Sequence, residues 1–173
     1  MVEKQEIVAM IREGAESVFS TMLTLPIHQQ PPRQEAGDPK AMDGVIALVG
    51  IAGKWTGTGR IHCSAEFACK IAGALVMSEY TSVDEEVLDG VAEVANMIIG
   101  HLKTSLEGKL GPLGMSVPTV IFGRNYQART AAVTDWTVVP FESDGQTMEV
   151  RFCLAETAPV KWSHATRTEP AIA

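Results

Sequence analysis

Residues 84–107, DEEVLDGVAEVANMIIGHLKTSLE, have the longest helical periodicity in the chain. Apolar residues recur there at steps of three and four positions, which at roughly 100° per residue gathers them into one stripe along a helix. The stripe consists of Val87, Leu88, Val91, Val94, Ala95, Ile98, Ile99, Leu102 and Leu106. Because such a stripe must be buried, we expect the rest of the domain to pack around this helix.

The outer face of the same helix carries Glu93 and Asn96, about 60° apart on neighbouring turns. Asp89 and Gly100 fall on this face too. Asparagine is a poor residue for a helix interior, and glycine costs about 1 kcal/mol relative to alanine. Gly100 would leave a bare spot where another surface could approach closely. Taken alone, these residues are explained as well by an ordinary solvated helix face.

A family resemblance gives this face a second interpretation. The run EVANMIIG, residues 93–100, resembles the signature helix of the CheC–CheX–FliY phosphatases of bacterial chemotaxis. The run VPTVIFGR, residues 117–124, resembles the Pro-Thr-Val segment of the CheX branch. With the strand-like block at residues 44–64, the similarity covers about residues 43–156. A single Glu-x-x-Asn motif, rather than two, resembles CheX more than CheC.

The resemblance implies a phosphatase that stimulates hydrolysis of the aspartyl phosphate on a CheY-like receiver domain. Asn96 would hold the attacking water, because a carboxamide adds no negative charge beside the phosphoryl group. Glu93 would anchor the invariant lysine of the receiver. Four neighbouring residues could lie at the edge of the contact and bind the partner: Asp89, Gly100, Glu86 and Lys103.

The resemblance also implies that no cofactor binds this chain, that Mg²⁺ comes with the phosphorylated partner, and that the protein is a homodimer. Strand exchange or edge pairing is the expected dimer contact, with the extended residues 128–142 as its candidate. The alternative function is a non-catalytic module that binds a receiver, since flagellar-switch proteins use the same fold as a scaffold. A second rival is an enzyme acting alone on a small phosphorylated substrate.

Composition limits the other classes of function. With 173 residues, 46% hydrophobic and 20% charged, the chain fits one globular domain with a real core. A net charge of −7 argues against a nucleic-acid partner, which needs a basic face. Its three cysteines lack metal-ligand spacing, which is typical of reduced thiols in the cytoplasm. Neither a signal peptide nor an apolar run of the roughly 18 residues that span a membrane is present, so we expect a cytoplasmic protein without membrane contact.

The first half of the chain predicts two further helices and a hairpin. Residues 3–23 form an amphipathic helix ended by Pro26, and residues 27–42 form a loop rich in proline. Residues 44–51 and 58–64 form a strand hairpin through a glycine-rich turn. A helix then runs to about residue 79, and Ser82 caps the helix that follows. The shorter helix has Ser64 as its cap and as its buried positions Phe67, Ile71, Leu75 and Val76.

The second half predicts strands. They cover residues 118–122, 128–142 and 148–154, and Asp144-Gly145 forms a hairpin turn between the last two. The order predicts an α+β fold with helices packed on one face of a mainly antiparallel sheet. We assign residues 1–25 to the N-terminal helix, 26–42 to a Pro-rich loop, 43–156 to a CheX-like core and 157–173 to a loosely ordered tail.

Other chemistries have weak signals. The glycines at residues 50–59 match neither a P-loop nor a dinucleotide fingerprint, and they lead from strand to strand. The four histidines are scattered, so we expect no metal site in this chain. No basic or glycine-rich cradle supports the small-substrate rival, and no serine or cysteine has a recognisable catalytic context.

Overall fold

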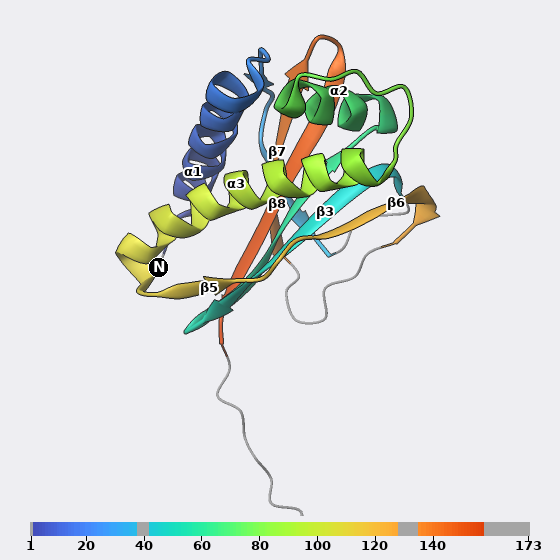
Figure 1. Ribbon diagram of the computed structural model, residues 1–173. Helices are drawn as coiled ribbons and strands as arrows, with labels where there is room; N and C mark the ends of the chain where they lie inside the picture. Colours follow the sequence, from blue (N-terminus) through green and yellow to red (C-terminus); the bar gives the residue numbers. More distant parts are fainter. Residues whose placement is uncertain (1, 38–41, 128–134, 158–173) are drawn as a thin grey trace, which may run out of the picture.

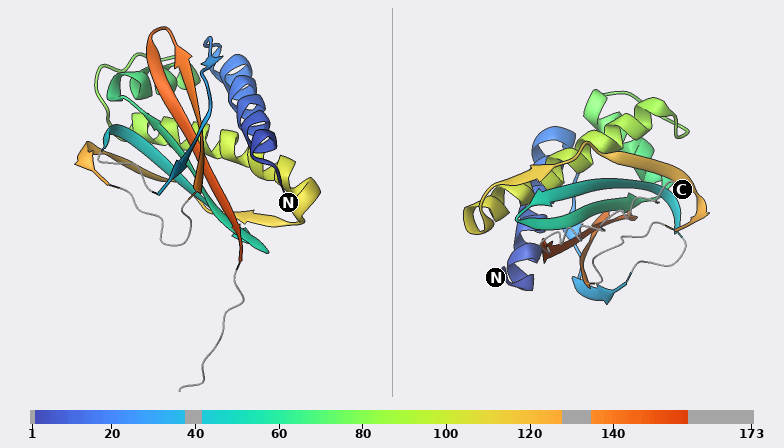
Figure 2. Two further views of the ribbon diagram at one scale, coloured as in Figure 1. Left: turned by 180° about the vertical axis from the view of Figure 1, so that it is seen from behind. Right: turned by 90° about the horizontal axis from the view of Figure 1, so that it is seen from below.

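The computed structural model describes residues 2–37, 42–127 and 135–157. Three α-helices lie on one face of a sheet in which every strand pair is antiparallel (Figures 1 and 2). The fold class predicted from the sequence is therefore confirmed. Along the sheet the strand order is β1-β7-β8-β4-β3-β5, with β2 also pairing with β7 and β6 also pairing with β3.

The helices are α1 (Lys4–Val18), α2 (Ala65–Val76) and α3 (Glu85–Leu110), and a π-helical turn, η1 (Phe19–Leu23), extends α1. The strands are β1 (His28–Gln29), β2 (Arg33–Ala36), β3 (Met42–Gly53), β4 (Trp55–Cys63), β5 (Leu113–Met115), β6 (Thr119–Tyr126), β7 (Asp135–Ser143) and β8 (Gln146–Glu156).

Helix α3 lies across the sheet and forms the centre of the core, as its periodicity predicts (Figure 1). Eight of the nine predicted stripe residues are fully buried, and Leu88 is half-buried. The helix begins one residue after Asp84, whose carboxylate accepts a 2.9 Å hydrogen bond from the Val87 amide. Ser82 is therefore not the cap, and the expectation that it would be is wrong. Gly111 ends the helix.

Both predicted hairpins form. Strands β3 and β4 pair from Val45↔Cys63 to Ile51↔Gly57. At the β7–β8 turn, Asp144 and Gly145 have φ values of 49° and 79°. Two positive φ values in a two-residue turn are what a type I′ hairpin requires, which explains the Asp-Gly pair.

The predicted loop at residues 26–42 is wrong in part, because it contains β1 and β2, which pair with β7. These strands have no apolar alternation for a sequence pattern to detect. Instead, two ion pairs connect β2 to β8, Arg33–Glu149 at 2.5 Å and Glu35–Arg151 at 2.6 Å, on the sheet face opposite the helices. Further ion pairs join the two partners within β2 and within β8. The four side chains are Arg33, Glu35, Glu149 and Arg151.

These ion pairs outweigh the effect of burial on the two carboxylates. Burial raises the pKa of Glu149, but the adjacent guanidinium groups of Arg33 and Arg151 leave that pKa below its ordinary value. The pKa of Glu35 is lowered in the same way against its own desolvation. Both carboxylates thus favour their charged form in the fold.

Strand β7 also corrects the predicted dimer contact. Its one edge pairs with β8 and its other edge pairs with β1 and β2. An interior strand cannot offer an edge to a second chain, so edge pairing through the part of the candidate stretch in β7 is excluded, whereas strand exchange stays a prediction. Residues 128–134 of that stretch, like the tail from residue 158 onward, lie outside the described residues.

Candidate active site

Helix α3 presents Glu93 and Asn96 one turn apart, above its buried stripe. Val94, Ala95, Ile98 and Ile99 are at most 1% exposed and fix the helix against the sheet. Glu93 and Asn96 belong to one rigid helix, so their spacing is set by helix geometry alone. Their Cβ atoms are about 5–6 Å apart.

Asn96 is half-buried. Its carboxamide makes no hydrogen bond to any other described residue, yet neither polar atom is enclosed. The amide nitrogen can donate two hydrogen bonds and the oxygen can accept two. A half-buried carboxamide with unused donors and acceptors is suited to hold a water molecule at a fixed point on the surface.

Glu93 is exposed, and its carboxylate has no ion pair with any other residue that the structure describes. A carboxylate with no partner of its own can accept a cation from another molecule at little desolvation cost. The two residues therefore offer an anion beside a neutral hydrogen-bonding group.

Asp89 and Gly100 lie on the same side of α3 as Glu93. Asp89 is exposed. A Cβ atom added to Gly100 would meet only the Met115 methyl, at 3.7 Å, which is ordinary van der Waals contact. Gly100 is half-buried, so the helix backbone is partly exposed one turn beyond Asn96.

Glu86 and Lys103 have partners within the chain. The Tyr80 hydroxyl donates a 2.7 Å hydrogen bond to Glu86, and this carboxylate raises the pKa of the phenol. Lys103 forms a 2.8 Å ion pair with Glu107. Their proposed role in partner binding stays a prediction.

A groove beside Glu93 escaped the sequence analysis. It lies between the end of α2 with the segment that follows and the first half of α3, and holds about 580 Å³. Its lining residues are Leu75, Val76, Ser78, Tyr80, Glu86, Asp89, Gly90 and Glu93. Val76 was expected in the core because it is apolar, but it is 52% exposed. Helical spacing could not show this, since it depends on where the chain turns after α2.

The competing sites gain no support from the geometry. Gly57 and Gly59 lie buried within β4, where an added Cβ would meet the Cys153 carbonyl oxygen at 2.2 Å and the Ile99 side chain at 2.5 Å. They serve strand packing and not a phosphate loop. Burial also raises the pKa of Cys63 to about 12, which keeps this thiol protonated and unreactive.

Within residues 2–37, 42–127 and 135–157, no group of three or more His, Cys, Asp or Glu side chains is placed to share a metal ion. No helix in these ranges has the length and apolar character needed to cross a membrane.

The fold and the site together define an α+β domain whose central helix displays a glutamate and an asparagine to an approaching molecule. The sequence profile described as "Chemotaxis phosphatase CheX" matches residues 45–142 of this chain. The chain therefore belongs to the CheX family, which confirms the resemblance of residues 93–100 and 117–124.

Individual relatives agree with this assignment. The "CheY-P phosphatase CheX" of Thermotoga maritima is 30% identical over 90 residues, which is 51% of this chain and 58% of that protein. The crystal structure of CheX from Vibrio vulnificus superposes with a TM-score of 0.76, at 26% identity, over 87% of this chain and 99% of that one. CheX from the CheX–CheY–BeF3–Mg²⁺ complex of Borrelia burgdorferi gives a TM-score of 0.74, at 28% identity, over 86% and 97%.

Proposed function

We propose that this protein stimulates hydrolysis of the aspartyl phosphate on a CheY-like receiver domain, in chemotaxis or related two-component signalling. The observation that carries the proposal is the half-buried carboxamide of Asn96, which makes no hydrogen bond to another described residue, beside the exposed carboxylate of Glu93. Membership of the CheX family supports it, as do a relative named for CheY-P phosphatase activity and a relative crystallised with CheY.

The chemistry needs little from this chain beyond position. An aspartyl phosphate is an acyl phosphate and is already reactive, and Mg²⁺ in the receiver's own site offsets its charge. The slow step is the placing of a water in line with the departing aspartate oxygen. Asn96 donates to and accepts from that water, and its neutrality avoids repulsion of the phosphoryl oxygens.

Glu93 anchors the receiver through the lysine that the family resemblance implies at the rim of the phosphorylation site. Its exposure and its lack of an ion pair among the described residues leave it open to that cation. The edge of the proposed contact is formed by Asp89, Glu86, Gly100 and Lys103. Gly100 lets the receiver surface come close to the helix backbone.

Replacement of Asn96 tests the proposal. We expect Asn96→Ala to lower kcat for dephosphorylation of an acetyl-phosphate-loaded receiver by about 100-fold or more, because the water loses its position. Binding of a beryllofluoride-loaded receiver should persist, and circular dichroism should show an unchanged fold. Glu16→Ala, at an exposed position on α1, is the matched control.

The assay is run with the protein at a small fraction of the receiver concentration. A catalyst clears the phosphorylated receiver under those conditions, whereas a binding module acts only at matching concentration. If Asn96→Ala clears phosphate as fast as the parent protein, the assignment of this residue is wrong.

The expected setting of the activity also belongs to the proposal. The protein acts in the cytoplasm, where response regulators are phosphorylated, and it does so as a homodimer with one active helix in each subunit. This chain brings no metal or cofactor of its own to the reaction.

A further inference from the structure

The groove between α2 and α3 has two walls of different chemistry. Leu75 and Val76 at the end of α2 make one wall apolar. Glu86, Asp89 and Glu93 line the other wall, on successive turns of α3. We call these lining residues, with Ser78, Tyr80 and Gly90, the α2–α3 groove.

Tight packing beneath the groove fixes its shape. Gly90 lets α3 approach α2 so closely that an added Cβ would lie 2.8 Å from the Ala72 Cβ. Met77, at a φ of 56°, ends α2, and the Tyr80 hydroxyl ties the following segment to Glu86. The walls are therefore held by backbone packing and a hydrogen bond rather than by mobile side chains.

The charges of the acidic wall are unmatched within the structure as described. Asp89 and Glu93 form no ion pair with any described residue, and Glu86 interacts with the neutral Tyr80 hydroxyl. The opposite wall exposes 52% of Val76 to solvent. An apolar wall facing carboxylates is complementary to a lysine or arginine, whose aliphatic stem packs on apolar surface while its head reaches an anion.

We propose that the α2–α3 groove receives a lysine or arginine side chain from the same phosphorylated receiver on which Asn96 acts, and that this contact strengthens binding of the receiver. The inference rests on the proposed function, because Glu93 belongs both to the proposed active site and to the groove. A receiver docked on Glu93 and Asn96 must therefore cover one end of the groove.

The occupant is a second cation of the receiver, distinct from the lysine that Glu93 anchors beside the phosphoryl group. Asp89 lies one turn before Glu93 on the groove wall, farther from Asn96. A cation held there adds to binding of the receiver but not to the placing of the water. The groove thus affects KM, whereas Asn96 affects kcat.

Charge reversal in the groove tests the inference. We expect Asp89→Lys to raise KM for the acetyl-phosphate-loaded receiver about tenfold and to leave kcat within about twofold. The dependence of KM on salt should also weaken, because an attractive charge pair is lost. Val76→Ser, which shortens the apolar wall, should raise KM a few fold without changing the salt dependence.

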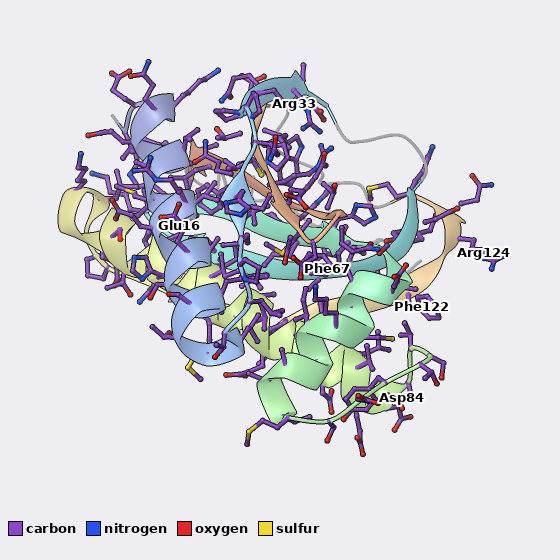
Figure 3. The ribbon with its side chains drawn as sticks, turned by 90° about the horizontal axis from the view of Figure 1, so that it is seen from above. Glu16, Arg33, Phe67, Asp84, Phe122 and Arg124 are labelled. Atoms are coloured by element: carbon purple, nitrogen blue, oxygen red, sulfur yellow. The ribbon has the colours of Figure 1, made fainter. Side chains whose placement is uncertain are left out.

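The matched control is Glu16→Lys, which makes the same charge change on α1, well away from Asp84 at the start of α3 (Figure 3). It should leave both kinetic constants unchanged. If Glu16→Lys raises KM as much as Asp89→Lys, the effect is one of net charge and the groove proposal fails. Unchanged KM in both Asp89→Lys and Val76→Ser also overturns it.

Binding separates this inference from the proposed function. The affinity of the beryllofluoride-loaded receiver is measured by calorimetry for the parent protein, Asp89→Lys and Val76→Ser. If the parent binds the receiver but does not dephosphorylate it, the catalytic proposal fails and the calorimetry still decides on the groove. If hydrolysis depends on Asn96 while both groove variants bind like the parent, the groove alone is wrong.

Discussion

Glu93 and Asn96 differ in exposure although they lie one turn apart on the same helix. The carboxylate is exposed, where a partner's cation can reach it at little cost, and the carboxamide is half-buried, where its position is better fixed. This difference matches a division between binding a neighbour and placing a water. Periodicity predicted that both residues face outward, but it could not predict their unequal exposure, which depends on the surrounding elements.

Replacement of Glu93 should act on binding. We expect Glu93→Lys to raise KM for the phosphorylated receiver about tenfold, because a like charge then meets the receiver's lysine. Glu93→Gln should fall between the parent and Glu93→Lys. Steady-state kinetics on the acetyl-phosphate-loaded receiver measures both, with Glu13→Lys on the exposed face of α1 as control. An unchanged KM in Glu93→Lys would remove this residue from the interface.

Two glycines of α3 have different surroundings. Gly90 permits close packing against α2, whereas Gly100 is half-buried and has room for a Cβ atom beside Met115. The sequence predicted the outward position of Gly100. The sequence could not predict that Gly90 packs against α2. In the sequence, a glycine that contacts another helix cannot be told from a glycine on an exposed face. The loop at residues 26–42 shows a similar limit, since polar cross-strand pairs hold β2 in place.

The two glycines should respond oppositely to alanine. Alanine favours a helix over glycine by about 1 kcal/mol, so Gly100→Ala should increase the free energy of unfolding by up to that amount. Gly90→Ala should lower it by about 1–2 kcal/mol, because the new methyl group overpacks against Ala72 and outweighs the same helical gain. Urea denaturation measures both. Equal shifts in the two variants would contradict the close packing of α2 against α3.

The whole sheet has two free edges within the described residues. One is formed by β6 with β5, which pair with β3 only, and the other by β1 with β2, which pair with β7 only. The sequence suggested residues 128–142 for the dimer contact because that stretch looked extended, yet β7 is interior. Alternation and turn signals identify strands, but neighbour order depends on which segments meet in space.

The longer free edge, β6, is the surface that we expect to pair in the homodimer. Light scattering should then give twice the monomer mass of 18.6 kDa. Hydrogen exchange of the β6 amides should slow as the protein concentration rises, because amides that lack a partner in one chain gain one in the pair. A single-subunit mass at every concentration would exclude the dimer. A dimer without added protection in β6 would move the contact elsewhere.

Helix α3 has a consequence for how such a protein can diverge. It forms the centre of the core and also carries the surface that we propose contacts the receiver. The proposed site residues Glu93 and Asn96 therefore cannot move to another element unless the core beneath them also changes. Substitutions at the solvent-facing end of α2 should reduce the stability of the fold far less, because the side chain of Val76 is 52% exposed. Related proteins could therefore come to bind a different receiver through changes at this end of α2, while the proposed chemistry at Asn96 stays the same.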